Sequence, residues 1–306
     1  MKDRRKSSSI TVHAQLALGM AVFGSATPVS KIVTGAMPVF VGSFLRVALG
    51  AIVLAPFVLR GWDQVRRLGR RDWWLIGLIS LFGMFGFSAL MLYGMGMVSG
   101  VVGAVVMSTA PAVTAAGSML FMGDRPTWRK LGAIALAVAG VLILQLGQSS
   151  GEEDGGSMLL GAALVLGAVC CEAAYTLLGK RATERVDPLI VAGLSAALAV
   201  PLFVPLAIWQ WSDFAIGETG WRAWSAVVWY GAGTLALGSW LWYSGLAKAE
   251  GAIAAGFMGV MPASALILSY VLLGEAFRWI HLAGFATVFA GVLLISWEHA
   301  RMSGET

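Results

Sequence analysis

An arginine and a glutamate, each isolated within a long uncharged stretch, are the residues of this sequence best placed to do chemistry. Arg46 ends Phe44-Leu45-Arg46 in an apolar run that begins at Pro38, and Glu172 lies in Cys171-Glu172-Ala173-Ala174-Tyr175. Eight helical residues put Arg46 about 12 Å along its run, at 1.5 Å per residue. If these runs are membrane helices, both charges are costly there and usually face a bundle interior or water.

Each charge has a functional and a structural interpretation. Arg46 either attracts the carboxylate of an amino acid or serves structure, by reaching outward or by anchoring neighbouring carbonyls. Glu172 either binds a substrate ammonium group or takes up a proton that couples transport to a gradient, or it lies in a wet vestibule or pairs with Lys180. Tyr175, about one turn beyond Glu172, is assigned with Arg46 and Glu172 to a predicted solute pathway through the helices.

Two prolines break apolar runs at equivalent places, 151 residues apart. Pro111 follows Ser108 and Thr109, and Pro262 follows Met258. A proline inside a membrane helix removes a backbone donor and frees a carbonyl, which is tolerated where polar groups or a cavity satisfy it. We predict that these helices line the pathway and bend during gating; a static kink that only shapes packing is the alternative.

Thr27, which precedes Pro28 in the first apolar run, makes a weaker case of the same kind. Trp229, Tyr230, Trp240, Trp242 and Tyr243 form an aromatic-rich run in the second half, and of these Trp229 and Trp240 are assigned to the pathway. Their rings either stack an aromatic substrate in an apolar pocket or lie at the lipid headgroups, as most tryptophans here are expected to do.

The amino-acid composition predicts that transmembrane helices position these residues. Of 306 residues, 58% are hydrophobic and 12% charged, with a mean hydropathy of +0.80, whereas an ordinary soluble domain has about 25% charged residues. Lipid is therefore the solvent for most of the chain. Windows of about 19 residues predict ten transmembrane helices, at Val12–Val33, Pro38–Leu59, Trp73–Met95, Val101–Met122, Arg129–Leu146, Ser157–Gly179, Pro188–Gln210, Arg222–Leu246, Gly251–Leu273 and Trp279–Trp297.

The basic residues predict the orientation. With ten helices, 17 Lys and Arg residues fall on the side of the two termini and three on the other side. Lys and Arg are retained on the cytoplasmic face, so both termini are predicted to be cytoplasmic in an inner (plasma) membrane. The same distribution explains the net charge of +5 without a nucleic-acid partner.

The sequence also repeats itself. Between Pro111–Leu144 and Pro262–Ile295 there are eleven identities in 34 positions, including Gly123 with Gly274 and Trp128 with Trp279. A unit of five helices is odd, so a second copy enters the membrane from the other side. We predict a first repeat over residues 1–148, an acidic external linker over 149–156, an inverted second repeat over 157–299 and a cytoplasmic tail over 300–306.

Several functional classes lack their signatures. The sequence has no H-E-x-x-H, no Gly-x-Ser-Gly with a mid-membrane histidine and no phosphate-binding loop, so we expect neither an enzyme nor a primary pump. Three dispersed histidines and the adjacent Cys170 and Cys171 suit no metal site, and no cofactor is expected. A channel or sensor stays open as an alternative.

These marks together resemble the ten-helix drug/metabolite transporter superfamily in its EamA-type branch. They are a first helix ending Pro28-Val29-Ser30-Lys31, the arginine at position 46, and a Gly-acid turn followed by a Gly-Val-Leu helix in both halves. The resemblance covers nearly the whole chain. It implies a secondary-active exporter of amino acids or related metabolites that works by alternating access. Within the branch the chain is most similar to YddG-type exporters of aromatic amino acids; efflux of drugs or other metabolites is the alternative. The expected partners are the small-molecule substrate, protons and membrane lipid. The protein is expected to be a monomer, with a dimer as the alternative.

Overall fold

The computed structural model describes residues 2–146, 155–246, 248 and 257–304. Every regular element in those ranges is helical. The first half of the chain contains α1 (Lys2–Gly24), α2 (Ala26–Thr34), α3 (Val39–Arg60), α4 (Trp62–Val65), α5 (Arg70–Ile79), η1 (Ser80–Gly86), α6 (Phe87–Met97), α7 (Gly100–Met107), α8 (Ala110–Phe121) and α9 (Trp128–Leu146).

The second half repeats this order. It contains α10 (Gly155–Ala182), α11 (Pro188–Trp209), η2 (Trp211–Asp213), η3 (Ile216–Glu218), α12 (Trp221–Val228), η4 (Trp229–Leu237), α13 (Gly238–Leu246), α15 (Val260–Leu273) and α16 (Trp279–Gly304). Here η1 and η4 are π-helical, whereas η2 and η3 are short 3₁₀ turns in the link before α12.

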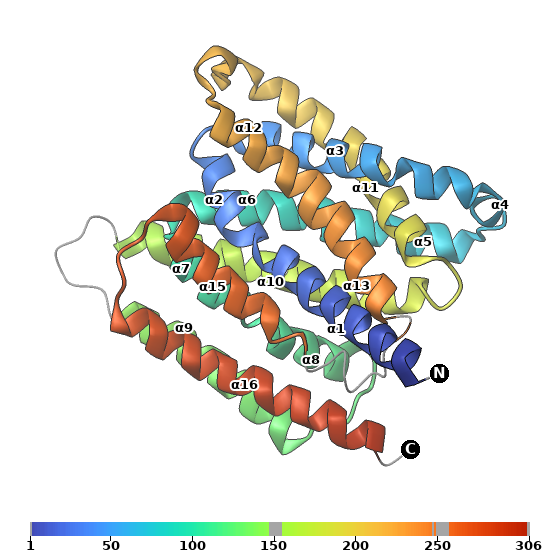
Figure 1. The fold of residues 1–306 in the computed structure, drawn as a ribbon. Coiled ribbons are helices and arrows are strands. Elements are labelled where there is room, and N and C mark those ends of the chain that lie inside the picture. Colours follow the sequence, from blue (N-terminus) through green and yellow to red (C-terminus); the bar gives the residue numbers. More distant parts are fainter. Residues whose placement is uncertain (1, 147–154, 247, 249–256, 305–306) are drawn as a thin grey trace.

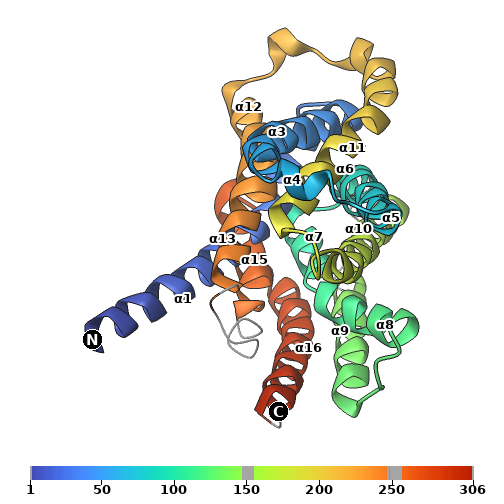
Figure 2. The same ribbon diagram turned by 90° about the vertical axis from the view of Figure 1, so that its right-hand side faces the viewer.

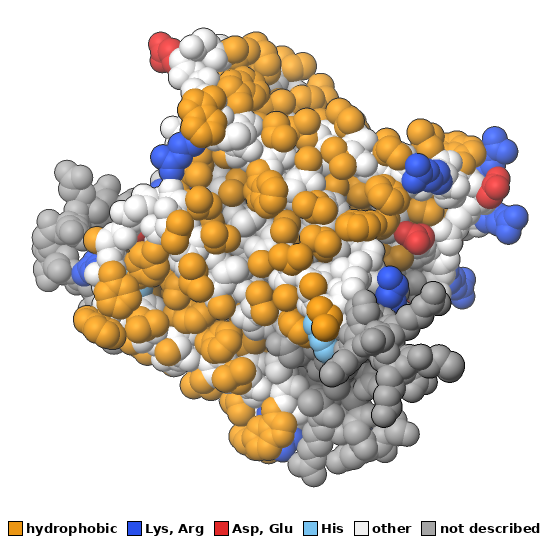
Figure 3. All heavy atoms as spheres, in the orientation of Figure 1, with side chains coloured by type: hydrophobic (Ala, Val, Ile, Leu, Met, Phe, Trp, Pro, Cys, Tyr) orange, Lys and Arg blue, Asp and Glu red, His pale blue; other side chains and the backbone are white. Residues whose placement is uncertain are grey.

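Ten helical spans cross the bundle, which confirms the predicted all-α membrane fold. Seven described spans are long and apolar enough to cross a membrane by themselves. The other three are α9, the run α12–η4–α13, and α15, whose described length is 14 residues. Exposed apolar side chains cover the side of the bundle in Figure 3, as a lipid-facing surface requires.

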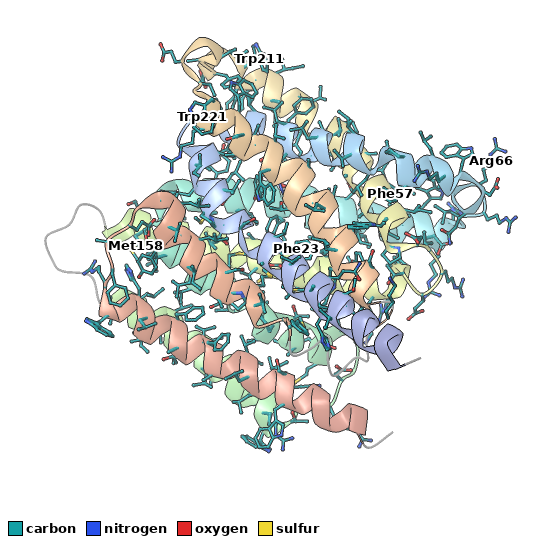
Figure 4. All side chains as sticks on the ribbon, viewed as in Figure 1. Phe23, Phe57, Arg66, Met158, Trp211 and Trp221 are labelled. Carbon is teal, nitrogen blue, oxygen red and sulfur yellow. The ribbon has the colours of Figure 1, made fainter. Side chains whose placement is uncertain are left out.

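The two ends of the bundle differ in charge. Both termini lie at the end that also carries Arg66, which we call the basic end (Figures 1 and 4). Met158, Trp211 and Trp221 lie at the opposite end. Termini that share one end require an even number of crossings, in agreement with ten.

The contact between α9 and α16 shows how the halves are related. A Cβ atom on Gly140 would lie 2.7 Å from the carbonyl oxygen of Gly284, and one on Gly291 would lie 3.0 Å from that of Ala133. Because Gly284 and Gly291 are the repeat equivalents of Ala133 and Gly140, this is one contact made twice with the partners exchanged. Such exchange is the property of a twofold axis. Figures 1 and 2 both show the two helices side by side.

The remaining pairs obey the same exchange. The second helices of the halves, α3 and α11, pack on each other, while α1 packs on α13 and α15 just as α10 packs on α6 and α8. Each half therefore seats its first helix against the third and fourth spans of the other half. The interior between the halves, where the site residues would be expected, is built by both.

Four of the spans predicted as single helices are interrupted. Ser25 separates α1 from α2, Ser108 and Thr109 separate α7 from α8, and the π segments η1 and η4 interrupt the third and eighth spans. The π segments fall at repeat-equivalent positions, and π-helical turns are frequent at functional sites. In the ninth span a turn at Met258 and Gly259 precedes α15, which matches the break before α8.

Three boundaries differ from the sequence-based expectations. Pro111 lies in the first turn of α8, where a missing N–H costs nothing, so it starts a helix instead of kinking one. The last helix continues to Gly304, through most of the predicted tail, because no breaker follows Trp297. The predicted linker lies outside the described residues except for Gly155 and Gly156, which begin α10, and so do residues 251–256 of the predicted ninth helix.

The α9–α16 crossing yields a stability prediction. Gly140→Val and Gly291→Val each place a side chain against backbone of the other half, so each variant should unfold at a lower temperature in detergent, by about 1–3 kcal/mol of overpacking. Gly132→Val is the matched control, since a Cβ atom there would have a flexible Leu294 methyl at 3.5 Å as its nearest neighbour. Equal unfolding temperatures for all three variants would contradict the close approach of the two helices.

Candidate functional site

Arg46 is the centre of a buried polar cluster between the halves. It lies on α3 with 7% of its surface exposed. Its Nη1 donates a hydrogen bond to Oγ of Ser88 on α6, and its guanidinium carbon lies 5.1 Å from the ring centre of Phe87 and 4.3 Å from that of Tyr230. The side chain is therefore held by one hydroxyl and two aromatic faces inside the bundle, and it does not reach outward.

A close approach between α3 and η4 makes this arrangement possible. A Cβ atom on Gly231 would lie 2.6 Å from the carbonyl oxygen of Arg46 and 2.8 Å from Cβ of Leu49. Only a residue without a side chain fits there. The absence of a side chain at Gly231 lets the neighbouring Tyr230 bring its ring over the guanidinium.

Glu172 enters the cluster from α10 of the second half. Arg46 interacts electrostatically with Glu172, Tyr175 and Tyr230, and within the described part of the chain no salt bridge joins Arg46 to Glu172. Oε2 of Glu172 is buried and has no hydrogen-bond partner in the described part of the chain. Lys180, proposed above as a partner, instead interacts electrostatically with Asp124.

Tyr175 sits one turn from Glu172 and extends the cluster toward the basic end. Its ring lies against Gly83 in η1, where an added Cβ would come within 2.9 Å of Cγ of the tyrosine. Its hydroxyl interacts with that of Tyr243 on α13. Sγ of Cys171, also on α10, lies 3.0 Å from the Cβ position of Gly86. Because Gly83 and Gly86 have no side chains, α10 can pack closely on η1.

Several polar atoms of this interior have no described hydrogen-bond partner. They are Nε of Arg46, Oε2 of Glu172, the Tyr230 hydroxyl and the hydroxyls of Ser43 and Ser80. Leaving a buried donor or acceptor unpaired costs about 1–3 kcal/mol each, more for charged groups. Of these groups, Glu172 and Tyr230 interact electrostatically with Arg46, and unpaired donors and acceptors beside a cation are what a site for a small polar solute requires.

The residues around the interrupted helices lie elsewhere in the bundle. Ser108 and Thr109 are buried, and their hydroxyls donate to the carbonyls of Val105 and Val106, at 2.5 and 2.7 Å. These side chains therefore satisfy backbone carbonyls of their own helix. Thr27 is buried on α2 with its methyl 3.5 Å from the Cβ position of Gly103 on α7, so two interrupted spans pack on each other.

The residues of the ninth span divide between surface and interior. Met258 is 38% exposed in the turn before α15, whereas Pro262 is buried in the first turn of that helix. A Cβ on Gly24 would collide with Met261 and Ser264, so the end of α1 lies directly against the start of α15. The breaks in the first and ninth spans are thus adjacent.

The two predicted tryptophans do not join the central cluster. Trp229 and Trp240 are each 41% exposed. Nε1 of Trp229 donates a 2.8 Å hydrogen bond to Oγ of Ser25, at the break between α1 and α2, and its ring covers Gly233. Trp229 therefore ties η4 to the interrupted first span rather than facing Arg46.

The sequence analysis missed Ser88 and Phe87, and it noted Tyr230 and Tyr243 only as members of an aromatic-rich run. Ser88, Phe87, Tyr230 and Tyr243 were not among the predicted site residues. Tyr230 carried a usable signal, because a tyrosine in an apolar span brings a hydroxyl that must find a partner. Ser88 and Phe87 carried none, since serine and phenylalanine are ordinary in membrane helices and only the packing brings them to Arg46. No cluster of three metal-ligating side chains exists among the described residues.

Comparison with known proteins gives the cluster its context. The EamA-like transporter family matches residues 12–146 and again 159–297, once for each half. A crystal structure superposes with a TM-score of 0.63 over 94% of this chain and 98% of its own, at 17% sequence identity. That likeness concerns the fold.

The similar curated proteins are transporters. The chain is 29% identical to the uncharacterized transporter YetK of Bacillus subtilis, over 92% of this chain and 86% of YetK. It is 25% identical to a probable terminal-alkyne amino-acid exporter of Streptantibioticus cattleyicolor, over 92% of each chain. It is also 38% identical to the threonine/homoserine exporter RhtA of Salmonella typhimurium, over 32% of this chain and 34% of RhtA.

The hydrogen bond to Arg46 can be tested by a pair of serines. Ser88→Ala removes the hydroxyl that the guanidinium contacts, and it should lower the free energy of unfolding by about 1.5–3 kcal/mol, the range for a hydrogen bond to a charged group. Ser43→Ala, an equally buried serine on α3 whose hydroxyl has no described partner, should be neutral. Denaturant titration in detergent measures both. Equal losses for the two variants would mean that Arg46 does not depend on Ser88.

Proposed function

Because the chain belongs to the EamA-like transporter family, we propose that it is a secondary-active exporter of amino acids or closely related metabolites. Of the relatives named above, one is a threonine/homoserine exporter and another a probable terminal-alkyne amino-acid exporter, which supports this substrate class. We further propose that it works by alternating access in an inner (plasma) membrane with both termini in the cytoplasm. The excess of Lys and Arg at the basic end supports this orientation.

The observation that carries the proposal is the state of Arg46. Its guanidinium is buried between two rings and one hydroxyl, and its Nε has no hydrogen-bond partner in the described part of the chain. A carboxylate is the natural ligand for such a group, since two oxygens match its planar donors. Arg46 would bind the carboxylate of the solute, and the Tyr230 hydroxyl would donate a second hydrogen bond.

Glu172 would have a second role in transport, beside the carboxylate binding proposed for Arg46. Its unpartnered Oε2 lies within electrostatic range of Arg46 and belongs to the other half of the chain. In one use it binds the α-ammonium group of the solute, and in the other it carries a proton in exchange for the solute. Both uses follow from a carboxyl group that no basic side chain among the described residues neutralises by direct contact.

Aromatic and hydrophobic amino acids are the narrower substrate proposal. Phe87, Tyr175, Tyr230 and Tyr243 give the cluster four aromatic rings, which favour an apolar or aromatic side chain over a charged one. Drug efflux is the second candidate, and the same rings would serve it. The absence of a carboxylate on the solute would then remove the need for Arg46.

The first test is transport by the purified protein in liposomes. Labelled aromatic, aliphatic and hydroxylated amino acids should be taken up with saturation and counterflow, whereas a channel would show neither. Arg46→Lys keeps the charge but loses the planar fork, and Arg46→Ala loses both, so uptake should fall by roughly tenfold or more in the first variant and further in the second. Arg66→Gln, at an exposed link, is the control. Full uptake by Arg46→Ala would remove Arg46 from the site.

The second test separates the two uses of Glu172. If the carboxyl carries the proton, Glu172→Gln should abolish the stimulation of transport by a pH gradient while leaving solute–solute counterflow near the level of the unaltered protein. If it binds the ammonium group, both activities should fall together. Glu184→Gln changes an exposed carboxyl at the basic end and is the control. A Glu172→Gln variant that keeps both activities and the pH dependence would dismiss both uses.

A further inference from the structure

A carboxylate of the second half caps a helix of the first half at the end opposite the termini. Glu275, just after α15, accepts hydrogen bonds from the backbone N–H groups of Gly100 and Val101, the second at 2.9 Å. The next N–H, that of Val102, donates to Oγ of Ser99. The first turn of α7 thus has its free N–H groups satisfied, and two of the three partners are supplied by the other half.

The sequence builds this contact locally. Gly274 ends α15 in the left-handed region, with φ of 66°, which turns the chain so that the next residue faces α7. Gly100 leaves room for the carboxylate, because a Cβ there would lie 2.9 Å from Oε1 of Glu275. The Gly-acid turn noticed as a repeat in the sequence therefore has a physical task in the second half.

Further contacts join the same two halves around the carboxylate. Oγ of Ser269 on α15 lies 3.2 Å from the carbonyl oxygen of Gly100, to which it donates. Lys31 on α2 interacts electrostatically with Glu275, and its Nζ donates a 2.8 Å hydrogen bond to the carbonyl of Met95 on α6. A cation, a carboxylate and a helix N-terminus therefore meet where the halves touch.

The repeat counterpart makes different contacts at the basic end. Asp124 accepts a 2.6 Å hydrogen bond from Ser118, the counterpart of Ser269, and lies 3.5 Å from Nζ of Lys130. The Ser118 hydroxyl, with Lys130 and Lys180 nearby, holds the pKa of the Asp124 carboxyl below its ordinary value. Ser118 thus bonds the acidic residue of its own half at the basic end, whereas its counterpart Ser269 bonds Gly100 of the other half at the opposite end.

We infer that Glu275 is a positioning residue of the transport cycle, whose hydrogen bonds to α7 hold the two halves together at the end opposite the termini. The inference rests on the proposed alternating-access mechanism. The carboxylate is favoured on α7 by direct hydrogen bonds and by the partial positive charge of a helix N-terminus. These contacts are made only while α7 and the turn after α15 touch, so they stabilise the closed state of this end and must break when it opens.

The test measures which end of the protein is accessible. In a protein with Cys170 and Cys171 replaced by serine, a single reporter cysteine is placed either at Ser30, buried on α2 near Lys31, or at Ser80, buried in η1 nearer the basic end. The rate of maleimide modification is measured in lipid nanodiscs without any solute. Glu275→Gln should raise the rate at the Ser30 reporter by roughly fivefold or more, the size of a typical coupling between sites, and lower it at the Ser80 reporter.

Controls separate this role from structural support. Glu218→Gln, an exposed acid in the link at the same end, should change neither rate. Glu275→Asp, which keeps the charge, should restore part of the closed state. Unchanged rates in Glu275→Gln would overturn the inference, and so would a rise at both reporters with a lower unfolding temperature, which indicates a loosened fold. Because no solute is present, failure of the amino-acid proposal in the liposome assay leaves this result interpretable.

Discussion

The interior of this protein is organised around one buried positive charge. Desolvating a guanidinium costs several kcal/mol even after the protein relaxes. Two cation–π contacts of about 2 kcal/mol each in a desolvated setting, with Phe87 and Tyr230, and a charge-assisted hydrogen bond of about 2 kcal/mol to Ser88 roughly balance that cost. The charge is thus tolerated without being neutralised, and a solute with a carboxylate would complete what the protein leaves unpaired.

The cluster around this charge is asymmetric within a symmetric frame. The exchanged contacts of α9 with α16, and of each first helix with the opposite half, obey a twofold axis. Yet the stretch of α11 that corresponds to Arg46 contains Ser195 and Ala196, both fully buried and uncharged. The glycines and small residues between the halves thus follow the twofold axis, whereas the polar residues around Arg46 do not.

The contacts between the halves are concentrated at particular helix pairs. Gln64 bonds the backbone of Arg185 and Asp187 at the basic end, and Oε1 of Gln210 accepts the N–H of Phe40 at the other. The contact between α3 and α11 is therefore tied by hydrogen bonds at both ends of the bundle. The interrupted spans, with breaks at Ser25, at Ser108 and before α15, pack mainly on one another rather than on this pair.

The sequence by itself determined the solvent, the helices and the repeat. Hydropathy fixes which segments lie in lipid, because lipid leaves every backbone group to be satisfied within a helix. The repeat then fixes the inversion, because five is odd. Arg46 and Glu172 were also found from sequence, since a charge in an apolar run is costly enough to stand out.

Only the tertiary structure decided which side chains surround Arg46 and Glu172. The contacts of Arg46 with the Tyr230 ring and the Ser88 hydroxyl depend on how closely α3, α6 and η4 approach one another. Gly231 permits this approach, but a glycine in the sequence does not predict which helix lies against it. The same holds for Trp229, which lies one residue from Tyr230 yet faces Ser25. The cap of α7 by Glu275 joins residues about 175 positions apart. Composition and periodicity report the environment of a residue, whereas a specific partner is set by packing between distant segments.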